Sequence, residues 1–162
     1  MSRDYDVPHV ESTGDWPQAI GLRNTMLLRT LTAGISYFAV VFAAGFVLGT
    51  LRLTLLAPVL GGLLAVLVEL PFMLIISWFA SHRITVIVSV PQRRTARIGM
   101  GAIAFALLMV AELALGLSVF QRTVREFFEA FATLEGVFGL VGQIAFALIP
   151  LAQTRKVAGS AT

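Results

Sequence analysis

Residues 59–80 form the sequence VLGGLLAVLVELPFMLIISWFA, which is almost entirely apolar and contains one ionisable side chain, Glu69. An α-helix rises 1.5 Å per residue, so about 20 apolar residues are needed to cross the hydrocarbon core of a membrane. The stretch is long enough to span, and the closing pair Trp78-Phe79 is typical of a helix end at the lipid headgroups. A carboxylate at that depth costs about 2.5–3.5 kcal/mol on insertion scales, so we expect Glu69 to face protein or water.

Three further stretches of the chain have a similar length and apolar character. They cover residues 30–50, 98–119 and 134–152. With residues 59–80 they predict one transmembrane domain, residues 30–152, that contains four spans.

The segment between the third and fourth spans is amphipathic. In residues 120–133, Val124, Phe127, Phe128 and Phe131 can share one helical face, while charged residues occupy much of the rest. The segment is too short to cross a membrane. The predicted fold class is therefore all-α: an integral membrane four-helix bundle with a short amphipathic surface helix between spans three and four.

Polar tails flank the predicted spans. Residues 1–29 are expected to form a cytoplasmic N-terminal tail in which Asp15 and Pro17 start a helix. That helix can lie at the membrane interface with Trp16 at headgroup depth, or it can be a short exposed helix. Residues 153–162 are expected to form a cytoplasmic C-terminal tail.

The composition excludes several classes of function. Only 13% of the residues are charged, about half the usual share for a soluble domain, and the absence of cysteine excludes disulfides and thiolate chemistry. His9 and His82 have no second ligand at metal spacing, and Ser36, Ser77 and Ser118 have no histidine or lysine base nearby. No phosphate loop or nucleotide-binding motif occurs. We therefore expect no enzymatic activity, no metal, no cofactor and no nucleic-acid partner.

The distribution of basic residues predicts the orientation, because cytoplasmic loops are enriched in lysine and arginine. Four spans place both termini on the same side. That side has Arg3, Arg23, Arg29, Arg83, Arg93, Arg94, Arg97, Arg155 and Lys156, and the other side has Arg52, Arg122 and Arg125. We therefore expect cytoplasmic termini. The cluster of Arg83, Arg93, Arg94 and Arg97 is expected to set this topology, with binding of anionic lipid headgroups as the alternative.

Four polar residues from four different predicted helices fall at similar depths: Arg52, Glu69, Glu112 and Gln143. In one interpretation Arg52 pairs with Glu112, while a protonated Glu69 bonds to Gln143 or to its own helix backbone. In a second, Glu69 and Glu112 line a route for protons or cations or bind a polar ligand. In a third, the carboxylates face a span of a partner protein.

Small residues at helical spacing predict how the helices pack, because close backbone approach drives helix association in membranes. The predicted packing residues are Gly45, Gly49, Gly61, Ala65, Gly116 and Gly139. Several of these positions share a face with one of the four polar residues, which favours a compact bundle with a polar centre.

The run AAGFVLGTLR at residues 43–52, the triplet Glu69-Leu70-Pro71 and the pair Ser77-Trp78 resemble a group of small, uncharacterised bacterial inner-membrane proteins. The run AELALG at residues 111–116 fits the same resemblance. The resemblance covers the four spans and implies a bacterial inner-membrane location. It implies no activity.

The sequence thus favours a small, non-enzymatic accessory or scaffold subunit that packs against another membrane protein or against a copy of itself. Its expected partners are membrane lipids and that protein. The alternative is a small transporter or channel component in which Glu69 and Glu112 handle protons or cations.

Overall fold

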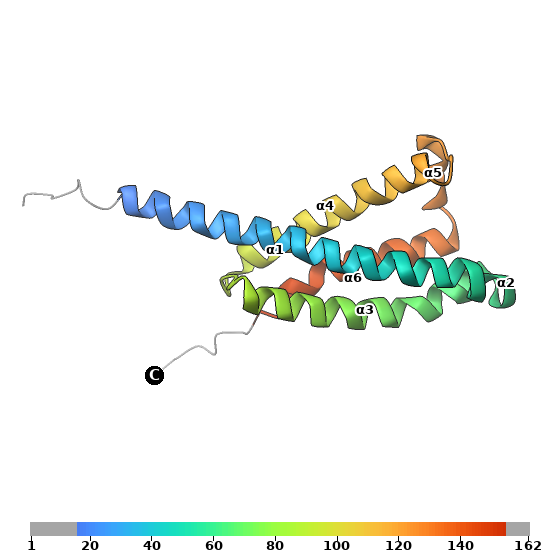
Figure 1. Cartoon of the computed structure of the whole chain (residues 1–162), viewed down its shortest axis with the longest axis horizontal. Coiled ribbons are helices and arrows are strands. Elements are labelled where there is room, and N and C mark those ends of the chain that lie inside the picture. The colour runs from blue at the N-terminus through green and yellow to red at the C-terminus, as the bar shows by residue number, and fades with distance from the viewer. Residues whose placement is uncertain (1–15, 155–162) are drawn as a thin grey trace, which may run out of the picture.

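The computed structural model describes residues 16–154, and the side chains of residues 24–154, so the distal parts of both predicted tails lie outside the described residues. The elements in chain order are α1 (Trp16–Leu51), a π-helical turn η1 (Arg52–Leu56), α2 (Ala57–Leu60), α3 (Gly62–Ile87), α4 (Arg94–Ser118), α5 (Val124–Ala130) and α6 (Leu134–Ala152). No strand occurs in this range, so the predicted all-α class is confirmed (Figure 1).

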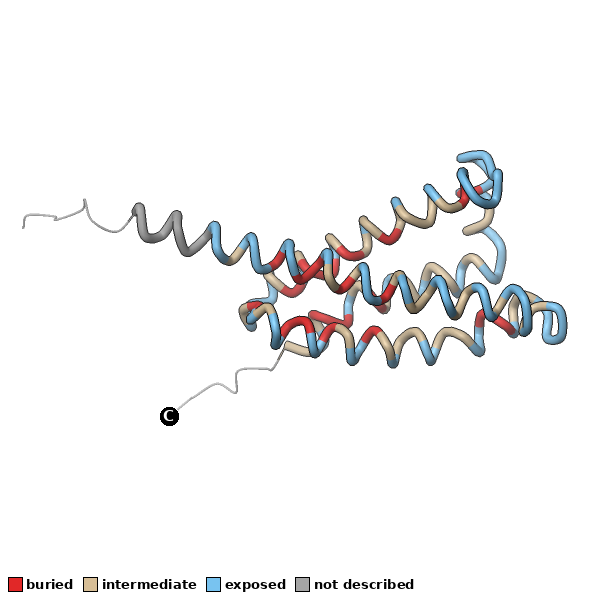
Figure 2. The backbone as a smooth tube through the Cα atoms, viewed as in Figure 1, coloured by how far each residue is buried: buried red, intermediate tan, exposed pale blue. Residues whose placement is uncertain are grey.

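Four helical segments are long and apolar enough to cross a membrane. They are Asn24–Leu60, Gly62–Ile87, Arg94–Ser118 and Leu134–Ala152. Exposed residues recur along all four helices in Figure 2, and large apolar side chains such as Val59 and Ile87 are among the exposed ones. A water-soluble monomer rarely exposes so much contiguous apolar surface. Length, composition and exposure together indicate a multi-pass membrane protein.

Helix α1 is longer than the predicted first span. It contains 36 residues, which corresponds to about 54 Å at 1.5 Å per residue. The predicted interfacial helix and the span that begins near residue 30 are therefore one continuous helix, and the expectation of two separate elements is wrong. The physical reason is that no proline interrupts the chain between Pro17 and Pro58, so the backbone hydrogen bonds continue without a break.

The turn after α1 begins before Pro58. The N–H of Ala57 bonds to the carbonyl of Arg52, which is the wide hydrogen bond of a π-helix. Pro58 has no N–H to offer the Thr54 carbonyl, so a regular α-helical ladder cannot continue through this turn. The chain reverses at Gly61, whose φ of 81° favours glycine. Gly61 therefore forms the turn, and this role replaces the predicted role in helix packing.

The four long helices form a bundle in which each one has two main neighbours. Helix α1 packs against α3 and α4, and α6 packs against the same two helices, so α1 and α6 occupy one diagonal. Figure 1 shows α4 diverging from α1 toward α5, whereas the two helices lie close together near the α3–α4 loop. The bundle is therefore narrow at that loop and wider at the end that carries α2 and α5.

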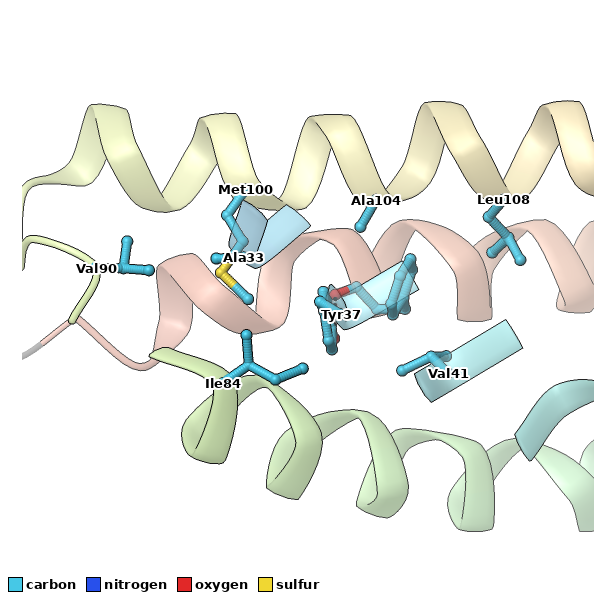
Figure 3. Close-up of a cluster of buried hydrophobic side chains, with 9 residues drawn as sticks. Ala33, Tyr37, Val41, Ile84, Val90, Met100, Ala104 and Leu108 are labelled. Atoms are coloured by element: carbon cyan, nitrogen blue, oxygen red, sulfur yellow. Dashed lines mark hydrogen bonds between the residues drawn. The ribbon is translucent and has the colours of Figure 1, made fainter. Parts of the chain in front are cut away.

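The apolar core fills the narrow part of the bundle. It consists of Ala33, Tyr37, Val41, Ile84, Val90, Met100, Ala104, Leu108 and Phe146 (Figure 3). The Tyr37 ring stacks on Phe146 with 4.6 Å between centroids, and its hydroxyl donates to the Phe146 carbonyl at 3.0 Å. That carbonyl lacks its usual helical donor, because residue 150 is a proline. Tyr37 thus satisfies a backbone acceptor that Pro150 leaves open.

The closest helix approaches occur at glycines that the small-residue pattern did not single out. A Cβ at Gly101 in α4 would collide with the Ala147 carbonyl of α6, and one at Gly142 in α6 would collide with Leu70 of α3. A Cβ at Gly34 in α1 would come within 2.9 Å of Ile103 in α4. Gly34 and Gly101 let neighbouring backbones approach closely, as expected for packing within a membrane, and Gly142 makes room for the Leu70 side chain.

The predicted packing residues have mixed roles. Ala65 is fully buried, and a Cβ at Gly45 would lie 3.2 Å from the Met73 side chain of α3. A Cβ at Gly116 would lie 3.3 Å from Phe127 of the short helix α5, which is not one of the spans. A Cβ at Gly139 would meet no atom within 4 Å, so the structure places no helix contact there.

Candidate functional site

A cavity of about 850 Å³ occupies the wide end of the bundle. Its wall includes residues from the second half of α1, the π-turn η1, α3, the end of α4, α5 and α6. The four polar residues singled out in the sequence, Arg52, Glu69, Glu112 and Gln143, all line it. At its inner end the wall includes the core residue Phe146, so the apolar core forms the floor of the cavity.

The first polar pair joins the π-turn to α3. Arg52 Nε lies 2.7 Å from Glu69 Oε2, and the side chains are 27% and 16% exposed. The expected pairing of Arg52 with Glu112 is therefore wrong. Arg52 lies in η1, directly before the reversal that leads into α3, so its nearest acidic neighbour belongs to that adjacent helix. An ion pair at this position neutralises both charges within the apolar surroundings.

The second polar pair joins α4 to α6. The Gln143 side-chain amide nitrogen donates to both carboxylate oxygens of Glu112 at 2.7 Å. Within the described residues, no lysine, arginine or histidine nitrogen lies within 4 Å of that carboxylate. The Gln143 carbonyl oxygen is buried and has no hydrogen-bond partner in the described part of the chain. Glu112 and Gln143 thus bring more acceptors than donors to the cavity wall, and the Gln143 oxygen lies buried within it.

Two further carboxylates lie around the cavity, and both interact with a helix N-terminus. Glu135 lies against Gly62 in the first turn of α3, where the helix dipole favours a negative charge. Glu126 forms a capping box with Thr123 at the start of α5. The Thr123 backbone N–H donates to Glu126 and holds the pKa of that carboxyl below its usual range. Each of these two carboxylates therefore lies at a helix N-terminus, whereas Glu112 is bonded only to the neutral Gln143 amide.

The predicted basic cluster lies at the opposite end of the bundle, around the α3–α4 loop. Arg83, Arg93 and Arg94 are exposed there. Arg97 differs, because it is only 3% exposed and one guanidinium nitrogen lies 3.5 Å from the Val90 carbonyl. The structure therefore assigns Arg97 to the packing of the loop and leaves the other three at the surface.

One polar contact at this end was missed by sequence reasoning. Gln153, just after α6, donates to the Trp78 carbonyl at 2.8 Å and accepts a hydrogen bond from Ser81 at 2.8 Å. Ser81 is fully buried. The available signal was a serine within an apolar span, which needs a partner. These two hydrogen bonds join the residue that follows α6 to α3.

No protein-family model matches the chain, and no curated protein or solved structure shows significant similarity to it.

Proposed function

We propose that this chain is a multi-pass protein of a bacterial inner membrane, with both termini in the cytoplasm, that handles protons or cations as a small non-enzymatic transporter or channel component. The observation that carries the proposal is the Glu112–Gln143 pair on the cavity wall. It offers a carboxylate without a cationic partner and a buried amide oxygen without a donor. A proton or cation satisfies both groups, whereas an anion satisfies neither.

The two glutamates have different roles in this proposal. Glu69 is held by Arg52, so its charge is already compensated. Glu112 is held only by a neutral amide, so it gains most from taking up a positive charge. In this proposal the cavity opens to the outer side of the membrane, which the distribution of arginine supports because cytoplasmic segments are enriched in basic residues. The short helix α5 then lies at the outer membrane surface, with the exposed Phe128 toward the lipid and the buried Phe127 toward the cavity.

Proton flux in liposomes tests the proposal. Purified protein is reconstituted with a pH-sensitive dye inside the vesicles, and flux is measured after an imposed proton gradient. Wild-type protein is expected to dissipate the gradient faster than protein-free vesicles, and Glu112→Gln to return the rate to that of protein-free vesicles. Glu129→Gln is the matched control, because Glu129 is an exposed carboxylate that pairs with Arg125 outside the cavity. Equal rates for wild type and Glu112→Gln contradict the proposal.

The accessory-subunit role remains the second candidate, and helix α1 favours it. Figure 1 shows the N-terminal part of α1 projecting beyond the other helices. Leu27 and Leu28 in that part are 55% and 62% exposed. A partner helix or a second copy that packs along this projection buries these leucines. The test is a pull-down from native membranes in mild detergent with Leu27→Ser and Leu28→Ser together. Loss of a stoichiometric partner supports the role, and recovery of the chain alone from wild-type membranes contradicts it.

The structure changes which variants separate the two functions. The sequence pattern favours Gly45→Leu as a test of association with a partner. Gly45, however, lies against Met73 within the same chain, so a leucine there disturbs the bundle itself. Variants in the projecting part of α1 leave the cavity wall intact and therefore isolate association from ion handling.

A further inference from the structure

Several aromatic rings line the cavity wall. The phenylalanines that line it are Phe42, Phe46, Phe120, Phe127, Phe131 and Phe146. They come from α1, from the segments on either side of α5, from α5 itself and from α6. Cations are attracted to the faces of such rings, and the attraction is larger where water is excluded. The structure already contains one such contact, because the Arg122 guanidinium lies 5.7 Å from the centre of the Phe120 ring.

The acceptor groups lie in the same wall as these rings. The Glu112 carboxylate and the unpartnered Gln143 carbonyl oxygen provide a negative charge and a neutral acceptor side by side. This combination matches a cationic head group that carries N–H donors. The remaining charges on the wall are engaged: Arg52 with Glu69, Glu126 with Thr123, Glu135 at the start of α3, and Arg122 over the Phe120 ring.

The cavity is larger than a bare ion needs, so a bare ion would contact only part of its wall. Protein sites for small organic molecules have volumes of about 300–1,000 Å³, mostly apolar linings and a few placed polar groups. The volume of about 850 Å³ falls in this range. A proton or an inorganic cation needs the acceptors alone and leaves the phenylalanine rings without a role.

We propose that the cavity binds an organic ammonium ion with an apolar body, with the ammonium group at Glu112 and Gln143 and the body among the phenylalanine rings. This inference rests on the proposed function, because it names the kind of cation that Glu112 takes up. Two sources supply this chemistry: a free lipophilic amine and the ethanolamine headgroup of a phospholipid.

Binding of three matched probes to the full chain tests the inference. Phenylbutylammonium, phenylbutanol and phenylbutanoate share one apolar body and differ in the charge of the head group. Equilibrium dialysis against protein in a non-ionic detergent, with empty micelles as background, measures each affinity. Wild type is expected to bind the ammonium about tenfold more tightly than the alcohol and to bind the carboxylate least, because charge-assisted hydrogen bonds are about twice as strong as neutral ones.

Two variants separate the parts of the site. Glu112→Gln is expected to remove the preference for the ammonium over the alcohol. Gly139→Leu places a large side chain on the cavity wall where the backbone has open space, so it is expected to weaken binding of both probes without disturbing the fold. Glu129→Gln, outside the cavity, is expected to bind as wild type does. Equal affinity for ammonium and alcohol in wild type, or an unchanged preference in Glu112→Gln, overturns the inference.

Competition by lipids distinguishes the two sources. Phosphatidylethanolamine and phosphatidylglycerol share the phosphate and the acyl chains, and only the first carries an ammonium group. Displacement of the probe by phosphatidylethanolamine alone assigns the site to a lipid headgroup, and displacement by neither assigns it to a free amine. Equal displacement by both shows recognition of the shared phosphate or chains and overturns the inference.

The outcome is separable from that of the flux experiment. If the ammonium preference is absent while proton flux still depends on Glu112, the substrate class is wrong and the proposed function stands. If the preference is present while flux does not depend on Glu112, the binding site stands and the transport role is wrong.

Discussion

Replacing Tyr37 with phenylalanine removes one hydroxyl from the centre of the bundle and leaves the stacked ring in place. The hydroxyl donates to the Phe146 carbonyl at 3.0 Å. Pro150 cannot supply the usual helical N–H to that carbonyl. A buried acceptor that loses its partner costs about 1–3 kcal/mol, and hydrogen bonds between membrane helices average about 0.6 kcal/mol. Since this carbonyl has no second donor in its own helix, we expect Tyr37→Phe to cost about 1.5 kcal/mol of unfolding free energy.

A second substitution tests the cause of that cost. Pro150→Ala restores the backbone N–H that the Phe146 carbonyl lacks, so Tyr37→Phe in this background leaves no acceptor unpaired. Its cost should fall to about 0.5 kcal/mol, which corresponds to a coupling of about 1 kcal/mol between the two sites. Pro71→Ala is the matched control, because that proline removes the helical donor of the Leu67 carbonyl, which Tyr37 does not serve.

Unfolding in mixed micelles at increasing mole fractions of dodecyl sulfate, followed by circular dichroism, measures these free energies. The reasoning is refuted if Tyr37→Phe costs the same in the wild-type and Pro150→Ala backgrounds. It is also refuted if Pro71→Ala reduces the cost as much as Pro150→Ala does, because the effect would then not be specific to the Phe146 carbonyl.

Three further predictions concern packing, charge and capping. Gly101→Leu should cost about 3 kcal/mol or more, because the α4 and α6 backbones touch there; a dodecyl sulfate midpoint equal to that of wild type contradicts this. Arg52→Gln should cost about 1 kcal/mol by leaving Glu69 unpaired, and exchanging the two residues should restore stability, measured in the same way; an exchange less stable than Arg52→Gln contradicts the pairing. Thr123→Ala should weaken α5 by about 1 kcal/mol, seen as faster amide exchange in that helix. The pKa of Glu126 is lowered chiefly by the Thr123 backbone N–H, which Thr123→Ala keeps. The stabilising effect of this carboxylate is complete above the usual carboxyl pKa and is lost as the pH falls through the lowered pKa, so amide exchange in α5, relative to that of an unfolded chain at the same pH, should become faster in acid in both proteins.

The sequence predicted the apolar helices because hydropathy is a property of single segments. About 20 apolar residues suffice to predict a span, whatever surrounds it. The predicted start of the first long helix was wrong for a local reason. Polar residues such as Arg23, Asn24 and Arg29 suggested a separate interfacial segment, but polar side chains do not interrupt the backbone hydrogen bonds of a helix. The packing role expected for Gly61 was wrong because glycine serves both packing and reversal, and only the backbone angle separates the two roles.

The members of the polar site were predictable, and their partners were not. Depth along each helix follows from counting residues, and the four residues expected at similar depth, Arg52, Glu69, Glu112 and Gln143, all line one cavity. Partner choice depends on how far each helix is rotated about its axis and on which helices are neighbours. Neither quantity is contained in a hydropathy pattern. The contact between Tyr37 and the Phe146 carbonyl was open to prediction, because every proline within a helix frees a carbonyl four residues earlier.

The floor of the cavity constrains how any ion crosses the bundle. Val41, Leu108 and Phe146 belong both to the cavity wall and to the apolar core. Below them Tyr37 spans the diagonal between α1 and α6 and is itself fully buried. A charge that enters from the wide end therefore reaches Glu112 and meets a closed apolar layer, where a desolvated ion is costly. Under the proposed function, passage therefore requires that layer to open. The hydroxyl of Tyr37 lies in this layer, so the bond that stabilises the core would also set part of the cost of opening it.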